Sequence, residues 1–83
     1  MTVKLFGTLR LDSGVKELQL EAESVKALYS LVTRQLRAGK PESAITEKTL
    51  RGCLVAVNGA PAGPGTKLRD GDLVYFFPAA AGG

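Results

Sequence analysis

One stretch of this chain, residues 25–38, has the apolar spacing of an amphipathic helix, and no other stretch limits the fold more. Its apolar residues recur every three or four positions, at Val25, Leu28, Val32 and Leu36. Ser24 is a good N-cap because its hydroxyl can accept from a free backbone amide, and Gly39 followed by Pro41 stops the helix. A chain of 83 residues with one such helix is expected to pack it against a sheet.

The residues before the helix predict a hairpin. Residues 2–9 are rich in strand formers, with Val3 and Leu5 on one face. Residues 12–14 (Asp-Ser-Gly) have the side chains of a turn, and residues 15–21 predict a returning strand with a slip or a bulge.

The residues after the helix begin with the weakest pattern of the chain. Residues 40–50 have turn residues and a weak apolar pattern, and they predict one helical turn or none. Residues 53–57 are wholly apolar and predict a buried strand, which ends at Asn58-Gly59, a pair that readily takes positive φ in a tight turn. Residues 60–65 contain two prolines and two glycines and predict a rigid loop.

The last strand is predicted over residues 73–77, after an Asp-Gly-Asp turn at 70–72. The order is then strand, strand, helix, strand, loop, strand, and the crossover helix permits parallel pairing. We therefore predict an α+β fold: a mixed sheet of four to five strands with one main helix on one face. Residues 1–78 are expected to form a single domain, and residues 79–83 a flexible tail.

Composition excludes several classes of protein. One cysteine and no histidine argue against a metal, haem or disulfide framework and against a catalyst that works alone. The longest apolar run, residues 73–81, is broken by Pro78, so no membrane segment is expected. Lys4 and Arg10 interrupt the start where a secretory signal would need an apolar block, which predicts a cytoplasmic chain. The net charge of +3 is scattered along the chain, which argues against direct nucleic-acid binding.

The sequence ends at Gly82-Gly83, and this ending is the most informative feature for function. Residues without a Cβ can enter a passage too narrow for any other residue, which would bring an α-carboxylate to a distant active site. A carboxylate acylates poorly unless ATP activates it, and no stretch has the glycine–lysine spacing of a phosphate-binding loop. We therefore expect no cofactor bound by this chain and ATP used by a partner enzyme. The alternative is a frayed, solvated end.

Several motifs follow one another in a fixed order. In the second half they are Val57-Asn58-Gly59, the segment from Thr66 to Val74, Phe76-Phe77-Pro78 and Gly82-Gly83; near the start, the segment from Leu5 to Arg10 precedes Gly14. Together they resemble the MoaD/ThiS family of ubiquitin-like sulfur carriers, over nearly the whole chain except residues 40–52. The resemblance implies the β-grasp fold, in which the first and last strands lie side by side and the helix packs across the sheet. The element order reached from the residues alone agrees.

The resemblance also implies the role of each tail residue. Gly83 would be the working residue: an E1-like enzyme of the MoeB/ThiF type adenylates its carboxylate, and a persulfide sulfur donor converts the acyl-adenylate to a thiocarboxylate. Gly82 would give the narrow approach. Phe77 before Pro78 is similar to the molybdopterin synthase small subunit, which hands sulfur to a cyclic pterin precursor on a large subunit of the MoaE type. The implied function is sulfur donation in molybdenum cofactor biosynthesis. The three alanines at 79–81 depart from the family's more varied linker.

Alternation along the strands places three aromatic side chains, Phe6, Tyr75 and Phe77, on the sheet face opposite Phe76. If the helix covers the face with Phe76, the other face carries an exposed aromatic patch at the root of the tail, where a partner can bind. Pro61, near the same edge, extends this patch. The alternative is that loops partly cover both faces and that Tyr75 or Phe77 is ordinary core.

The one cysteine and two aspartates near the last strand are predicted to have structural rather than chemical roles. Cys53, at the start of an apolar strand, is predicted to be a small buried hydrophobe rather than a sulfur-handling thiol. Asp70 and Asp72 are predicted to accept backbone amides in a turn rather than to form an acid–base pair.

Three further functions stay open. The chain could carry sulfur to another acceptor, as in tRNA thiolation or the synthesis of cysteine or thiamine. It could instead be a ubiquitin-like modifier joined to protein lysines, or a plain interaction module. All but the last use an activated Gly83.

Overall fold

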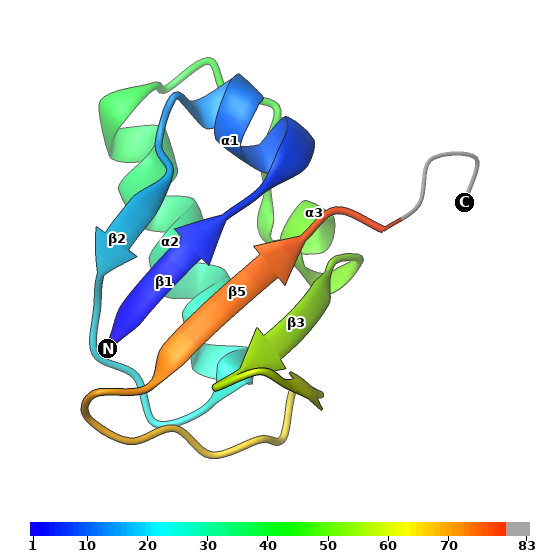
Figure 1. The fold of residues 1–83 in the computed structure, drawn as a ribbon. Coiled ribbons are helices and arrows are strands. Elements are labelled where there is room, and N and C mark those ends of the chain that lie inside the picture. Colours follow the sequence, from blue (N-terminus) through cyan, green and yellow to red (C-terminus); the bar gives the residue numbers. More distant parts are fainter. Residues whose placement is uncertain (80–83) are drawn as a thin grey trace.

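The computed structural model describes residues 1–79, in which a five-stranded sheet carries the helix α2 across one face (Figure 1). The strands are β1 (Thr2–Leu5), β2 (Glu17–Gln19), β3 (Leu54–Val57), β4 (Ala60–Ala62) and β5 (Leu73–Phe77), and the helices are α1 (Gly7–Ser13), α2 (Val25–Gly39) and α3 (Glu47–Arg51).

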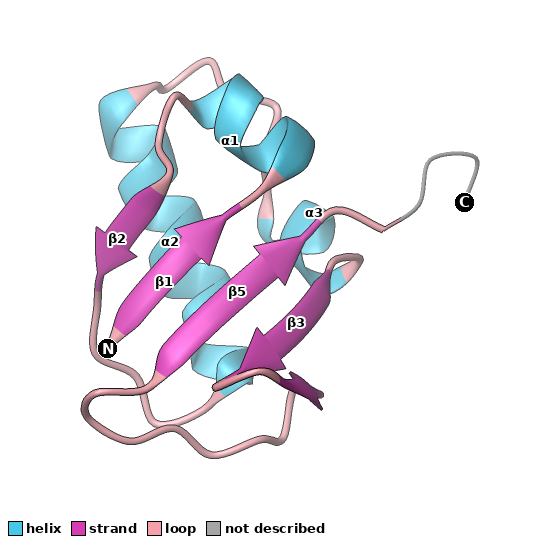
Figure 2. Ribbon diagram, viewed as in Figure 1, coloured by secondary structure: helices cyan, strands magenta, loops and turns pink. Residues whose placement is uncertain are grey.

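The sheet is mixed, with the order β2-β1-β5-β3-β4. β1 and β5 pair in parallel at its centre, and the other neighbours are antiparallel. Figure 2 shows α2 and α3 behind the sheet, while α1 lies at the end where β1 stops. This is the expected β-grasp fold, with the first and last strands side by side. None of the helices within residues 1–79 is long and apolar enough to cross a bilayer.

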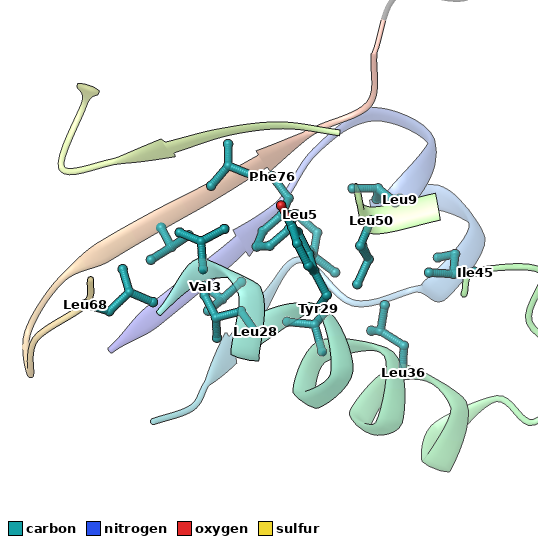
Figure 3. Close-up of a cluster of buried hydrophobic side chains, with 14 residues drawn as sticks. Val3, Leu5, Leu9, Leu28, Tyr29, Leu36, Ile45, Leu50, Leu68 and Phe76 are labelled. Carbon is teal, nitrogen blue, oxygen red and sulfur yellow. The ribbon is translucent and has the colours of Figure 1, made fainter. Parts of the chain in front are cut away.

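The core lies between the sheet and α2. Side chains of α2, among them Leu28, Tyr29 and Leu36, point toward those of β1 and β5 (Figure 3). Each large apolar side chain buried there contributes about 1.5–3 kcal/mol of transfer free energy. The buried apolar residues are Val3, Leu5, Leu9, Val25, Leu28, Tyr29, Val32, Leu36, Ile45, Leu50, Val55, Leu68, Val74 and Phe76.

The predicted helix is confirmed, and it extends one residue further, to Gly39. The Ser24 hydroxyl accepts from the Ala27 N–H at 3.3 Å, as expected of an N-cap. Residues 40–52 contain one short helix, α3, preceded by a capping box between Thr46 and Thr49. Of the two alternatives for this segment, the single helical turn is the correct one.

The first strand is shorter than predicted. It ends at Leu5, and residues 7–13 form α1 instead of continuing the strand into a turn. Leu9 explains the difference, because the helix buries it in the core at 2% exposure. Gly14 closes α1 in the left-handed conformation, with φ of 71°, and its N–H donates to the Arg10 carbonyl. The antiparallel β1–β2 pair is confirmed, but β2 covers only Glu17–Gln19 and its link to β1 is this helix.

The hairpin of β3 and β4 agrees with the sequence in its turn and differs from it in both strands. Asn58 and Gly59 take φ of 52° and 86°, as expected for a tight turn. The chain then forms the edge strand β4, where a loop over residues 60–65 was predicted. β3 is not wholly buried, and Leu54 is 65% exposed. The reason is that no helix in the described part of the chain covers the outer face of the sheet there. β5 has the predicted bounds and alternation.

Candidate functional site

Three aromatic rings gather on the sheet face that α2 does not cover. Phe6 stacks on Phe77 with ring centroids 4.7 Å apart, and Tyr75 meets these two rings edge-on at 5.1 and 5.9 Å. Such pairs contribute about 0.5–1.5 kcal/mol each beyond their buried area. The alternation that separates them from the buried Val74 and Phe76 agrees with the sequence prediction.

The rings are half-buried rather than fully exposed, which corrects the expectation of an open patch. The cause is their mutual contact, since each ring covers part of its neighbours. Each keeps some surface for a partner and is held in position by the other rings. A rigid aromatic group loses little conformational entropy when it binds.

Strand register extends this surface across β3 and β4. Leu54 lies opposite Phe77, and Ala56 lies between Tyr75 and Pro61. Pro61 and Phe77 line one shallow, mostly apolar hollow of about 330 Å³. We call this surface the outer apolar face; it consists of Phe6, Leu54, Ala56, Pro61, Tyr75 and Phe77.

Leu54 belongs to this surface although the sequence predicted it to lie in a buried strand. At 65% exposure it is one of two exposed large hydrophobic residues among those described, the other being Leu11 on α1. The missed signal is the parity of the strand. Because Val55 is buried, Leu54 must point to the other face.

The root of the tail is fixed beside these rings. The Phe6 N–H donates to the Phe76 carbonyl at 3.2 Å, and Pro78 packs on Gly7. Figure 1 shows the chain leaving the sheet at this end of β5, and Phe77, the last residue of β5, belongs to the outer apolar face. Gly82 and Gly83, the predicted activation site, lie outside the described residues, as does all of the predicted tail except Ala79.

Cys53 is half-buried, less than predicted. Its thiol donates to the Thr49 carbonyl at 3.3 Å, and burial raises the pKa of Cys53 above its ordinary value of 9.0. The thiol is therefore protonated at neutral pH and a poor nucleophile. No group of side chains within residues 1–79 has the make-up of a metal site.

Asp72 accepts a backbone amide, as predicted, and Asp70 does not. The Arg69 N–H donates to the Asp72 carboxylate at 2.8 Å, and the Asn58 side chain donates to it at 2.9 Å. The Asn58 side chain also accepts from the Leu73 N–H. The pair joins the β3–β4 turn to the start of β5. Asp70 is exposed, and within residues 1–79 its carboxylate accepts no hydrogen bond.

Comparison with known proteins adds to this geometry. The model of the ThiS family matches residues 3–83. The small archaeal modifier protein 1 from Methanosarcina acetivorans is 28% identical, with a TM-score of 0.74 over 99% of this chain and 94% of that one. A chain in the BexX/CysO complex of Amycolatopsis orientalis is 27% identical, with a TM-score of 0.69 over 99% and 98%.

A further structure shares the fold at lower identity. The putative molybdopterin converting factor subunit 1 from Pyrococcus furiosus is 24% identical, with a TM-score of 0.70 over 95% of each chain. No curated protein matches this chain.

Proposed function

Because this chain belongs to the ThiS family of ubiquitin-like sulfur carriers, we propose that it carries sulfur as a thiocarboxylate on Gly83. The observation that supports this most is the position of the outer apolar face at the root of the segment that leads to the two terminal glycines, within a family match that extends to residue 83. A partner bound to this face would receive the tail.

In this proposal, partner proteins catalyse both the adenylation and the sulfur transfer. An E1-like enzyme of the MoeB/ThiF type would transfer AMP from ATP to the Gly83 carboxylate and release pyrophosphate. A persulfide on the sulfur donor would then attack the acyl carbon and displace AMP. A second thiol would release the thiocarboxylate and take the donor's sulfur into a disulfide. Cys53 is not assigned to any of these steps because its thiol is protonated and donates a hydrogen bond to the Thr49 carbonyl.

The partner-binding surface in this proposal is the outer apolar face. Phe6, Tyr75 and Phe77 would be its aromatic anchors, and Pro61 and Leu54 would widen it toward β4. Aromatic side chains in a packed, partly desolvated cluster are the usual centres of binding energy at protein interfaces. The BexX/CysO complex joins a chain similar to this one to another protein, which supports a partner-dependent role here.

For the acceptor, we propose a cyclic pterin precursor in molybdenum cofactor biosynthesis, bound by a molybdopterin synthase large subunit of the MoaE type. The supporting feature is the Phe77-Pro78 pair, which resembles the small subunit of that enzyme. Phe77 stacks on Phe6 and Pro78 lies against Gly7, so in this proposal the pair would hold the start of the tail.

Mass spectrometry tests the carrier chemistry. Incubated with ATP, the adenylating enzyme and a persulfide donor, the intact protein is expected to gain about 16 Da as one oxygen is replaced by sulfur. A Cys53→Ser variant should gain the same mass, while a variant that lacks Gly83 should gain none. A mass gain that needed Cys53 would contradict the proposal.

The acceptor is tested in a second step. Addition of the large subunit and the cyclic pterin precursor to the thiocarboxylated protein should return its mass to the starting value, with sulfur recovered in the pterin. Retention of the sulfur under these conditions, with release to another acceptor, would contradict the molybdenum cofactor assignment and leave the carrier function intact.

A second candidate is a protein modifier, favoured by the similarity to a chain named as a small archaeal modifier protein. In that case Gly83 would form an isopeptide bond with a lysine of another protein. Trypsin cleaves after Arg69, so a modified lysine would carry residues 70–83 as a branch. Detection of that branched peptide in cell extract identifies conjugation.

A further inference from the structure

A second hollow lies on the other side of the aromatic cluster, toward β2 and α1. It measures about 430 Å³, and Phe6 and Tyr75 form part of its wall. Three cationic side chains also line it, Lys4, Arg10 and Lys16, with Glu17 as its one acidic residue. They come from β1, α1 and the segment before β2, so the tertiary structure gathers charges that the sequence scatters.

The charges of this hollow are not balanced. The one ion pair within residues 1–79 joins Lys4 to Glu17 at 3.9 Å, and both side chains are two-fifths exposed or more. Such an exposed pair stabilises little. Arg10 and Lys16 have no carboxylate partner among the described residues. The hollow therefore keeps a net positive charge against two aromatic rings.

We propose that this hollow receives a carboxylate side chain from an acidic segment of a protein that docks on the outer apolar face. The inference rests on the proposed function for the docking itself, because Phe6 and Tyr75 border both the hollow and that face. An apolar surface alone lets a partner slide or rotate. A charged group beside it sets the orientation and speeds the encounter, in a manner that salt weakens.

The ring geometry favours an acidic peptide over a nucleic acid. Single-stranded nucleic acids bind proteins by stacking bases on open ring faces along a basic groove. Here one face of Phe6 is covered by Phe77 at 4.7 Å, and Tyr75 meets Phe6 edge-on. The cationic side chains of Arg10 and Lys16 lie in one hollow rather than along a strip. A single carboxylate with its chain packed on the rings fits this arrangement.

Titration of the intact protein with an oligoglutamate peptide, followed by NMR, tests the site without any partner enzyme. The amide signals of Lys4, Arg10, Lys16 and Tyr75 are expected to shift most. The double variant Arg10→Glu/Lys16→Glu should bind the peptide about tenfold more weakly. The matched control is Lys26→Glu/Arg34→Glu on the exposed side of α2, which makes the same charge change and should bind within about twofold of the unchanged protein.

An equal loss of peptide affinity in both double variants would overturn the proposal, because the effect would then come from the net charge of the protein and not from this hollow. An oligouridylate that bound the same residues more tightly than the peptide would overturn it as well and assign the site to nucleic acid. Thermal melts of each variant check the fold. A failure to form the thiocarboxylate would reject the carrier function without changing the titration, so the two failures can be told apart.

Discussion

Gly7 meets two constraints at once. Its φ is +58°, a region that side chains with a Cβ rarely adopt, and a Cβ on it would lie 3.0 Å from Cγ of Pro78. These constraints come from the junction where β1 turns into α1 and from the departure of the chain after β5. A residue with a Cβ at this position would therefore be strained in its backbone and crowded against Pro78.

Gly7→Ala should therefore lower stability. The left-handed conformation costs a residue with a Cβ about 1–2 kcal/mol, and Pro78 must also move. For a domain of this size each 1 kcal/mol lowers Tm by about 4–8 °C. Gly39→Ala is the matched control, because within residues 1–79 nothing lies within 4 Å of its added Cβ at the end of α2. Calorimetry of both variants checks this; equal Tm values would contradict it.

Asp72 should make stability depend on pH in the acid range. The Asn58 side chain, and then the Arg69 N–H, hold the pKa of Asp72 below its ordinary value of 3.8. A carboxylate with a lowered pKa stabilises the fold above its unfolded value, and this stabilisation disappears as the pH falls through the folded value. The loss therefore begins near 3.8 and continues below it.

Asp72→Asn tests this. The variant should be less stable than the unchanged protein at about pH 7, and the difference should shrink as the pH falls below the ordinary value for the carboxyl group. Urea denaturation at several pH values measures it. Asp70→Asn in the same turn is the control, because its exposed carboxylate accepts no hydrogen bond within residues 1–79. A constant difference between Asp72→Asn and the unchanged protein would contradict the expectation.

At the scale of the element, β5 has one buried face and one half-buried face. Phe76 is fully buried against α2, with its ring 6.2 Å from that of Tyr29, while Phe77 is half-buried on the outer apolar face. Under the proposed function, these two neighbours of the same residue type would have different roles, Phe76 in the core and Phe77 in partner binding. The period of two in a strand makes this separation possible.

Phe76→Ala should cost about 3–5 kcal/mol of stability because it leaves a cavity in the core. Phe77→Ala should cost less and should weaken binding to the adenylating enzyme by about 1.5–3 kcal/mol, the value of burying one large side chain. Thermal melts and titration calorimetry together measure both effects. A Tm loss for Phe77→Ala as large as that for Phe76→Ala, with unchanged affinity, would place Phe77 in the core and contradict the partner face.

At the scale of the whole molecule, the fold has one covered and one open sheet face. All the buried core residues lie between Val3 and Phe76, and the helices α2 and α3 cover the same side of the sheet. A single domain of this size has no second layer for the other side. The open face is therefore available for a partner. We expect the proposed reaction of the Gly83 carboxylate to take place outside the core.

Removal of residues 80–83 should then leave Tm within about 2 °C of the full chain, because the last buried core residue among those described is Phe76. The same truncation should abolish pyrophosphate release and the mass gain with the adenylating enzyme. Calorimetry and mass spectrometry of one preparation give both results. A Tm lower by several degrees would show that the last residues hold part of the fold and would contradict the prediction of a separate tail.

The local sequence pattern was sufficient to predict several elements of the structure. The α2 spacing with Ser24 before it, the Asn58-Gly59 turn and the alternation along β5 each depend on near neighbours in the sequence, so each could be predicted. The alternation also grouped Phe6, Tyr75 and Phe77 correctly. The two terminal glycines are a property of the sequence alone, and with the ordered motifs they identified the family.

Distant contacts decided the rest. Residues 7–13 contain strand formers, but burial of Leu9 and the approach of Pro78 to Gly7 select a helix there. Leu54 is exposed because none of the described helices covers the outer face at β3. The basic hollow exists because folding brings Arg10 and Lys16 to the side of Tyr75. Local propensities differ by about 1 kcal/mol per residue or less, so burying one leucine outweighs them. For this reason the sequence determined α2 and β5, and the tertiary structure determined α1 and the make-up of the outer apolar face.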